Sequence, residues 1–60
     1  MHHLVRHQGQ AVEVRDCHGR VHRGVMERVD PARGIFARRR FIPFFLIASI
    51  FLLSTRRRIF

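Results

Sequence analysis

The sequence predicts a mainly β fold, in which a bent three-stranded antiparallel sheet, or half-barrel, is followed by a C-terminal apolar helix. Two observations support this prediction. Residues 9–40 alternate apolar and polar side chains between turns that contain glycine or proline, which is the pattern of short strands. Residues 41–53 then contain no charged side chain, so two physically different segments are joined in one chain.

Length and charge limit the classes of function. A chain of 60 residues forms one small domain at most, with little room for a deep active-site cleft. Its 12 basic residues are all arginine and outnumber four acidic residues, which gives a net charge of +8. Such a charge favours anionic partners, either nucleic acid or lipid headgroups. The lone Cys17 excludes an intramolecular disulfide.

The first elements follow from side-chain alternation. Residues 1–8 form a histidine-rich segment ahead of the sheet. Val12 and Val14 alternate with charged neighbours, which predicts a first strand with one apolar face. The polar residues 16–19 end in Gly19, a residue that can adopt positive φ, so a turn leads into the second strand.

The second strand carries Val21, Val25 and Val29, which we expect on one face. Gly24 interrupts this strand and is expected to allow a bend. A turn beginning at Asp30 and Pro31 then leads into a short third strand, residues 34–38. The residues with a predicted structural role in turns and bends are Gly19, Gly24, Asp30, Pro31 and Gly34.

Residues 9–38 resemble the first motif of the Sm/LSm family of small β-barrels. The matching positions, without a gap, are Gly9, Val12, Val14, Gly19, Gly24 and Asp30. The resemblance implies a strongly bent antiparallel sheet, preceded by a short helix within residues 1–8. The second motif of the family is absent, because no glycine follows Gly34, and a ring of the usual kind is therefore not expected.

The resemblance also bears on RNA binding. Family members that bind uridine-rich RNA stack a base on an aromatic or histidine residue just after the turn aspartate and hydrogen-bond it with an asparagine. Ala32 and Gly34 occupy the corresponding places here. The resemblance therefore implies the shape of the family's half-barrel without its base-specific pocket.

The apolar run predicts a helix over residues 41–55, with Pro43 in its first turn. Thirteen helical residues cover about 20 Å, less than the ~30 Å of a bilayer core, so shallow insertion competes with spanning. The leading hypothesis is membrane association, and the alternatives are burial within a homo-oligomer or packing on the sheet of a monomer. The predicted membrane-contacting residues are Phe41, Phe44, Phe45, Leu46, Ile47, Ile50, Phe51, Leu52 and Leu53.

Arginine triplets flank this run, and the second one opens a basic tail, residues 56–60. The predicted contacts to an anionic partner are Arg38, Arg39, Arg40, Arg56, Arg57 and Arg58. Their position beside an apolar segment favours anionic lipid headgroups, and nucleic-acid phosphates are the alternative. The larger positive charge before Phe41 predicts a cytoplasmic N-terminal domain of a membrane protein, with a cytoplasmic protein as the alternative.

No residue set predicts catalysis, a cofactor or a metal. Cys17 and Ser49 have no partner base in the sequence pattern. The five histidines, His2 among them, match no tight zinc-binding spacing. We therefore expect a non-enzymatic protein. The leading hypothesis is a small membrane-associated adaptor or structural protein with a basic Sm-like half-barrel, and the alternative is a soluble nucleic-acid-binding module that self-associates through its apolar segment.

Overall fold

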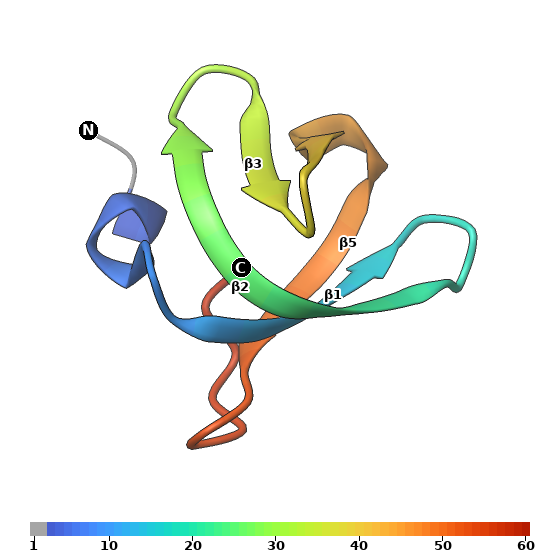
Figure 1. The fold of residues 1–60 in the computed structure, drawn as a ribbon. Coiled ribbons are helices and arrows are strands. Elements are labelled where there is room, and N and C mark those ends of the chain that lie inside the picture. The colour runs from blue at the N-terminus through green and yellow to red at the C-terminus, as the bar shows by residue number, and fades with distance from the viewer. Residues whose placement is uncertain (1–2) are drawn as a thin grey trace.

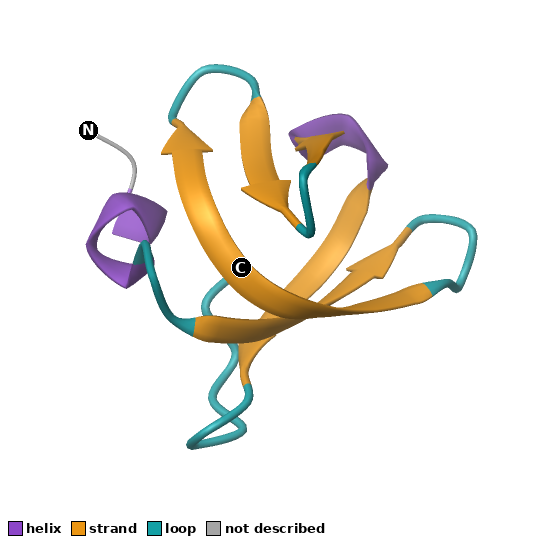
Figure 2. Ribbon diagram, in the orientation of Figure 1, coloured by secondary structure: helices purple, strands orange, loops and turns teal. Residues whose placement is uncertain are grey.

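The computed structural model describes residues 3–60, which form one five-stranded antiparallel sheet in the order β4-β3-β2-β1-β5 (Figure 1). Strands and loops make up most of the chain, and the two helices are short 3-10 turns (Figure 2). The elements in chain order are η1 (His3–His7), β1 (Ala11–Asp16), β2 (Val21–Asp30), β3 (Gly34–Ala37), β4 (Arg40–Pro43), η2 (Phe44–Leu46) and β5 (Ile47–Leu52).

The turn between β1 and β2 is organised by one carboxylate. Asp16 Oδ1 accepts hydrogen bonds from the backbone N–H groups of His18 and Arg20, each at 2.9 Å. Gly19 has a φ of 81°, a conformation that costs glycine little. The turn that the polar residues predict is therefore present, and it joins two antiparallel strands.

The long strand β2 changes partner halfway. Its first half pairs with β1 and its second half with β3, and the register shifts between Met26 and Arg28. Because of this irregularity, Val21 and Val25 are exposed whereas Val29 is buried. The prediction that the three valines share one face is wrong, since a strict period of two does not continue through a bulge.

Two glycines are required by close approaches between segments. A Cβ atom on Gly24 would lie 2.7 Å from Cγ of Arg38, so the Arg38 side chain crosses β2 at this position. A Cβ atom on Gly34 would lie 2.2 Å from the carbonyl oxygen of Ile42, because β3 and β4 are packed closely there. At the preceding turn, Asp30 Oδ1 accepts a hydrogen bond from the backbone N–H of Ala32 at 3.0 Å.

The prediction of a C-terminal apolar helix over residues 41–55 is wrong, and with it the three-stranded half-barrel. The apolar run instead contains the end of β4, the short turn η2 and the whole of β5. A single strand of 13 residues would be too long for so small a sheet. The run avoids that length by turning at η2, directly after Pro43, so that it supplies two strands instead of one.

Within residues 3–60 the helical segments are two 3-10 turns, and neither has the length and apolar character needed to span a bilayer. The predicted transmembrane helix and the membrane location derived from it are therefore wrong. Of the residues predicted to contact a membrane, Ile47, Ile50 and Leu52 instead pack in the core. The alternative, a cytoplasmic location, stays a prediction.

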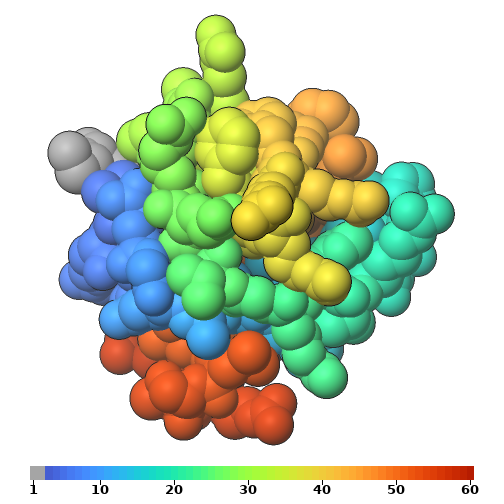
Figure 3. Space-filling model, in the orientation of Figure 1, coloured from blue at the N-terminus to red at the C-terminus, as the bar shows by residue number. Residues whose placement is uncertain are grey.

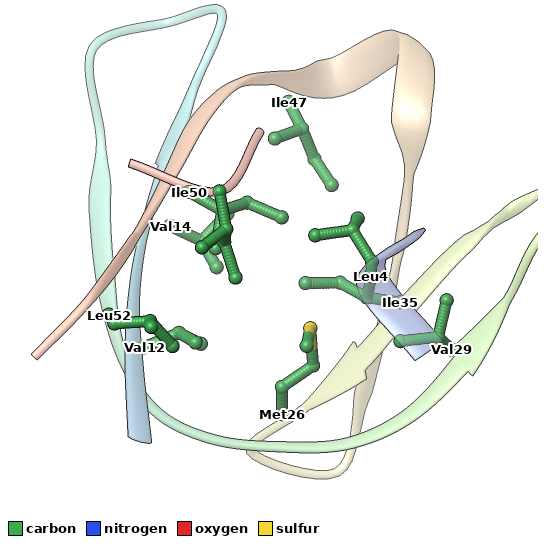
Figure 4. Packing of buried hydrophobic residues seen from close by; sticks show 10 residues of the cluster. Leu4, Val12, Val14, Met26, Val29, Ile35, Ile47, Ile50 and Leu52 are labelled. Carbon is green, nitrogen blue, oxygen red and sulfur yellow. The ribbon is translucent and has the colours of Figure 1, made fainter. Parts of the chain in front are cut away.

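The core fills the interior of the curled sheet. Side chains from β1 and β5 point toward those from β2, β3 and η1 (Figure 4). Leu4, Met26 and Ile35 are fully buried at its centre. The segment after β5 also contributes, because residues 57–60 fold back along β5 and bury Ile59. The ring of Phe60 stacks on that of Phe44, with centroids 5.3 Å apart.

Candidate nucleic-acid interface

The arginines of the first triplet form a strained turn. Ala37 pairs with Arg40, so Arg38 and Arg39 are the two central residues of the hairpin between β3 and β4. Their φ angles are 54° and 62°, as a type I′ turn requires, and such turns normally use asparagine and glycine. The left-handed conformation costs roughly 1–2 kcal/mol per residue with a Cβ atom. Two long cationic side chains are thus held at a position where stability favours other residues.

The same feature occurs in the second triplet. Arg56, in the turn after β5, has a φ of 61°. Among residues 3–60, every residue with positive φ that is not glycine is therefore an arginine from one of the two triplets. Strained backbone at exposed positions supports a functional role more than a structural one.

The structure distributes the six predicted anion-contacting arginines over separate places. Arg38 and Arg40 line a hollow of about 270 Å³ together with His22. Arg57 and Arg58 line a different hollow beside η1, and Arg56 lies at a third, next to Phe51. The two triplets therefore share no hollow among the described residues. The first is combined with His22 of β2, and Arg57 and Arg58 of the second lie with His3 and His7 of η1.

An aromatic pair lies beside the first triplet. Phe36 and Phe41 are cross-strand partners on β3 and β4, with ring centroids 5.1 Å apart and a tilt of 54°. Cζ of Arg28 lies 4.9 Å from the centroid of the Phe36 ring, within cation–π range. Phe41 is 42% exposed. In the space-filling view, the β3–β4 hairpin (yellow) lies across β2 (green) and extends toward the β1–β2 hairpin (teal) (Figure 3).

We refer to Arg28, Phe36, Arg38, Arg39, Arg40 and Phe41 as the hairpin face. Its arginines are not neutralised by acidic side chains, since the ion pairs found within residues 3–60 involve Arg15, His22 and Arg23. Among the described residues, Glu27 lies beside this face: its Oε1 accepts a hydrogen bond from the backbone N–H of Arg39 at 3.0 Å, and it lines a hollow with Arg28 and Phe36. The guanidinium groups of the hairpin face therefore remain available to an anionic ligand.

Two other acidic side chains, Glu13 and Asp16, have structural roles. Glu13 is buried and accepts hydrogen bonds from Arg23 and Arg15, each at 3.0 Å. These two bonds lower the pKa of Glu13 and outweigh the opposing effect of burial. Burial also raises the pKa of Asp16, but hydrogen bonds from His22 and from the backbone of the turn outweigh it, so the net pKa is lowered. Both carboxylates are therefore anionic at neutral pH.

Sequence reasoning identified the arginine triplet but not the residues around it. In the sequence, His22 is one of five histidines whose spacing matches no zinc-binding pattern, and Phe41 is predicted to lie in a membrane segment. The signal that predicts the aromatic pair is the short spacing of Phe36 and Phe41 around a two-residue turn, which makes them cross-strand neighbours.

The histidines that the structure describes and the cysteine form no metal centre. No group of three or more His, Cys, Asp or Glu side chains within residues 3–60 is arranged to hold a metal ion. His2, which was weighed as a ligand, lies outside the described residues. Cys17 is an exposed thiol in the β1–β2 turn.

Comparison with models of protein families, with curated proteins and with solved structures found no match for this chain.

Proposed function

We propose that this protein is a non-enzymatic binding module for single-stranded nucleic acid, and that the hairpin face is its binding surface. The observation that carries the proposal is the β3–β4 turn, where Arg38 and Arg39 occupy left-handed positions beside an exposed aromatic pair. Arginines supply phosphate contacts, and aromatic rings stack on bases, which are accessible in single strands.

The arrangement of the face supports single strands more than duplexes. Phe41 is exposed on β4, and the guanidinium of Arg28 already lies over the Phe36 ring. Both an aromatic ring and a guanidinium plane can stack on a base that is not paired.

We also propose that the chain is related in fold to the Sm/LSm proteins. A bent antiparallel sheet preceded by the short helix η1 supports this, because the resemblance implies both features. The residues at the family's base pocket, Ala32 and Gly34, still lack the required chemistry. Binding at the hairpin face therefore uses different residues. Self-association through the apolar run stays a proposal. The large apolar side chains that this run exposes are Phe41 and Phe45.

Fluorescence anisotropy with a labelled ten-nucleotide RNA tests the proposal. We expect binding that weakens with salt, with a log–log slope of about −2 or steeper if three or more phosphates are contacted. Replacing Phe41 with alanine should weaken binding about ten-fold or more and leave the salt slope unchanged, because it removes stacking and no charge.

Phe45→Ala is the matched control, since Phe45 is 82% exposed and belongs to η2, outside the hairpin face. It should bind RNA like the unmodified chain. No measurable RNA binding at low salt, or equal losses in the two phenylalanine variants, would overturn the proposal.

A further inference from the structure

We propose that the hollow lined by His22, Arg38 and Arg40 is a phosphate site, and that the adjoining hollow holds the nucleoside attached to that phosphate. This inference rests on the proposed function and names the unit of nucleic acid that is recognised. The ligand chemistry is a nucleotide phosphate, either at the 5′ end of a strand or between two nucleosides.

The phosphate site is built from two hairpins. His22 lies near the start of β2, whereas Arg38 and Arg40 belong to the β3–β4 hairpin, and the three line a hollow of about 270 Å³. No acidic side chain lines it. Two guanidinium groups lining one small hollow are suited to a phosphate, because each supplies several N–H donors whose hydrogen bonds strengthen with a charged acceptor.

Two of these side chains are held in place by neighbours. His22 Nε2 lies 3.1 Å from Asp16 Oδ2, and the other oxygen of this carboxylate is fixed by the backbone of the β1–β2 turn. Asp16 therefore positions the imidazole without lining the phosphate hollow itself. The stem of Arg38 lies against Gly24, where a side chain would leave no room for it.

The adjoining hollow has a different character. It measures about 340 Å³ and shares His22 and Arg40 with the phosphate hollow. The strand β4 and the turn η2 provide its apolar wall, and the β1–β2 turn provides polar groups. Its other lining residues are Asp16, His18, Arg20, Phe41, Ile42, Pro43 and Leu46. An apolar wall next to a cationic hollow suits a base joined through its sugar to a phosphate.

The test uses adenosine 5′-monophosphate, adenosine and inorganic phosphate, each titrated into the intact chain and followed by backbone amide NMR spectra. We expect the monophosphate to shift the amide signals of His22, Arg38, Arg40 and Phe41. Inorganic phosphate should shift the first three, and adenosine should bind about ten-fold more weakly than the monophosphate, because it lacks the charged contacts. Binding of adenosine as tight as that of the monophosphate would overturn the phosphate site.

Two variants separate this site from general charge effects. Arg40→Gln should raise the dissociation constant for the monophosphate about ten-fold, because it removes a charge-assisted contact. Arg57→Gln removes the same charge at a hollow that shares no residue with the proposed site, and should change the constant less than two-fold. Gly24→Ala should act like Arg40→Gln by displacing the Arg38 stem, while its amide spectrum remains that of a folded protein.

The RNA experiment distinguishes failure of this inference from failure of the proposed function. Monophosphate binding that is equally weakened in Arg40→Gln and Arg57→Gln would overturn the phosphate site. The hairpin face would remain the binding surface if Phe41→Ala still weakened RNA binding and Phe45→Ala did not. If the monophosphate binds but no RNA does, the proposed function fails and so does this inference, which depends on it. Comparing RNA with and without a 5′ phosphate decides the source: tighter binding of the phosphorylated strand supports an end-recognition site, and equal, Arg40-dependent binding supports an internal phosphate.

Discussion

Gly34 determines how closely β3 and β4 can approach. Replacing it with alanine should lower the free energy of unfolding by about 1–3 kcal/mol or more, since the new Cβ atom would lie 2.2 Å from the Ile42 carbonyl oxygen and the strands would have to separate. Urea denaturation measures this loss. Gly19→Asn is the control, because Gly19 has positive φ and open space around it, and asparagine tolerates that conformation. Equal stability of the two variants would contradict the steric argument.

Glu13 makes stability depend on pH. Its pKa in the folded protein is lowered from the ordinary value of 4.5, chiefly by hydrogen bonds from Arg23 and Arg15. A depressed pKa means that the ionised side chain stabilises the fold above the unfolded pKa, and that this contribution is lost as the pH falls below 4.5 and through the folded pKa. Thermal unfolding between pH 7 and pH 3 should show the loss.

The variant Glu13→Gln isolates this effect. It should be less stable than the unmodified chain at pH 7, and the difference should be smaller at pH 3, because the contribution of the ionised Glu13 falls as the pH drops below 4.5. Glu27→Gln serves as the control, because Glu27 is exposed and forms no ion pair within residues 3–60. A Glu13→Gln deficit that is the same at both pH values would contradict the interpretation.

At the scale of elements, the turn of the β3–β4 hairpin holds residues that favour binding but lower stability. Replacing Arg38 and Arg39 with asparagine and glycine should raise the free energy of unfolding by about 1–2 kcal/mol, because these residues suit the type I′ turn. The same change should weaken RNA binding and reduce its salt slope, since two phosphate contacts are removed. Denaturation and anisotropy on one sample measure both effects. If the double variant were less stable, or if it bound RNA as well as the unmodified chain, the proposed role of this turn in binding would be contradicted.

The elements also show how far sequence reasoning reached. The hairpin of β1 and β2 was predictable because alternation and turn residues are local signals. The strand β5 was not, because its residues lack alternation. Ile50 faces the core, Phe51 lies under the Arg15 guanidinium at 5.1 Å, and the tail pairs along the strand, so apolar residues are accommodated on both faces. A short strand that is covered on both faces has the same apolar composition as a buried helix. Only contacts between residues distant in the sequence decide between a strand and a helix.

The candidate site, like the fold, was predictable only where the signal is local in the sequence. The arginines of the β3–β4 turn were predictable as anion contacts, because charge is visible in the sequence. Their combination with His22 was not, since it depends on the hairpin lying across β2, which Gly24 permits. Phe41 was misassigned for a related reason: a membrane segment and an exposed aromatic platform both show phenylalanine next to arginine, and the strand pairing with Phe36 separates them.

At the scale of the whole molecule, the C-terminal residues complete the core. A domain of 60 residues has a net stability of about 3–9 kcal/mol, so a single buried side chain is a large share of it. Ile59 is 8% exposed, and the backbone around it is held to β5, with the Ile59 N–H donating to the Ile50 carbonyl at 2.8 Å. We therefore expect Ile59→Ala to lower the free energy of unfolding by about 2–5 kcal/mol.

This loss would bring the domain close to unfolding at 25 °C, because it approaches the whole net stability. Urea denaturation followed by far-UV circular dichroism measures it, and Arg57→Ala, an exposed neighbour, should change stability by less than about 0.5 kcal/mol. A small effect of Ile59→Ala would mean that the five strands close the core without the tail. A large effect would mean that the basic tail, which carries three arginines, is positioned by the same contacts that hold the sheet together.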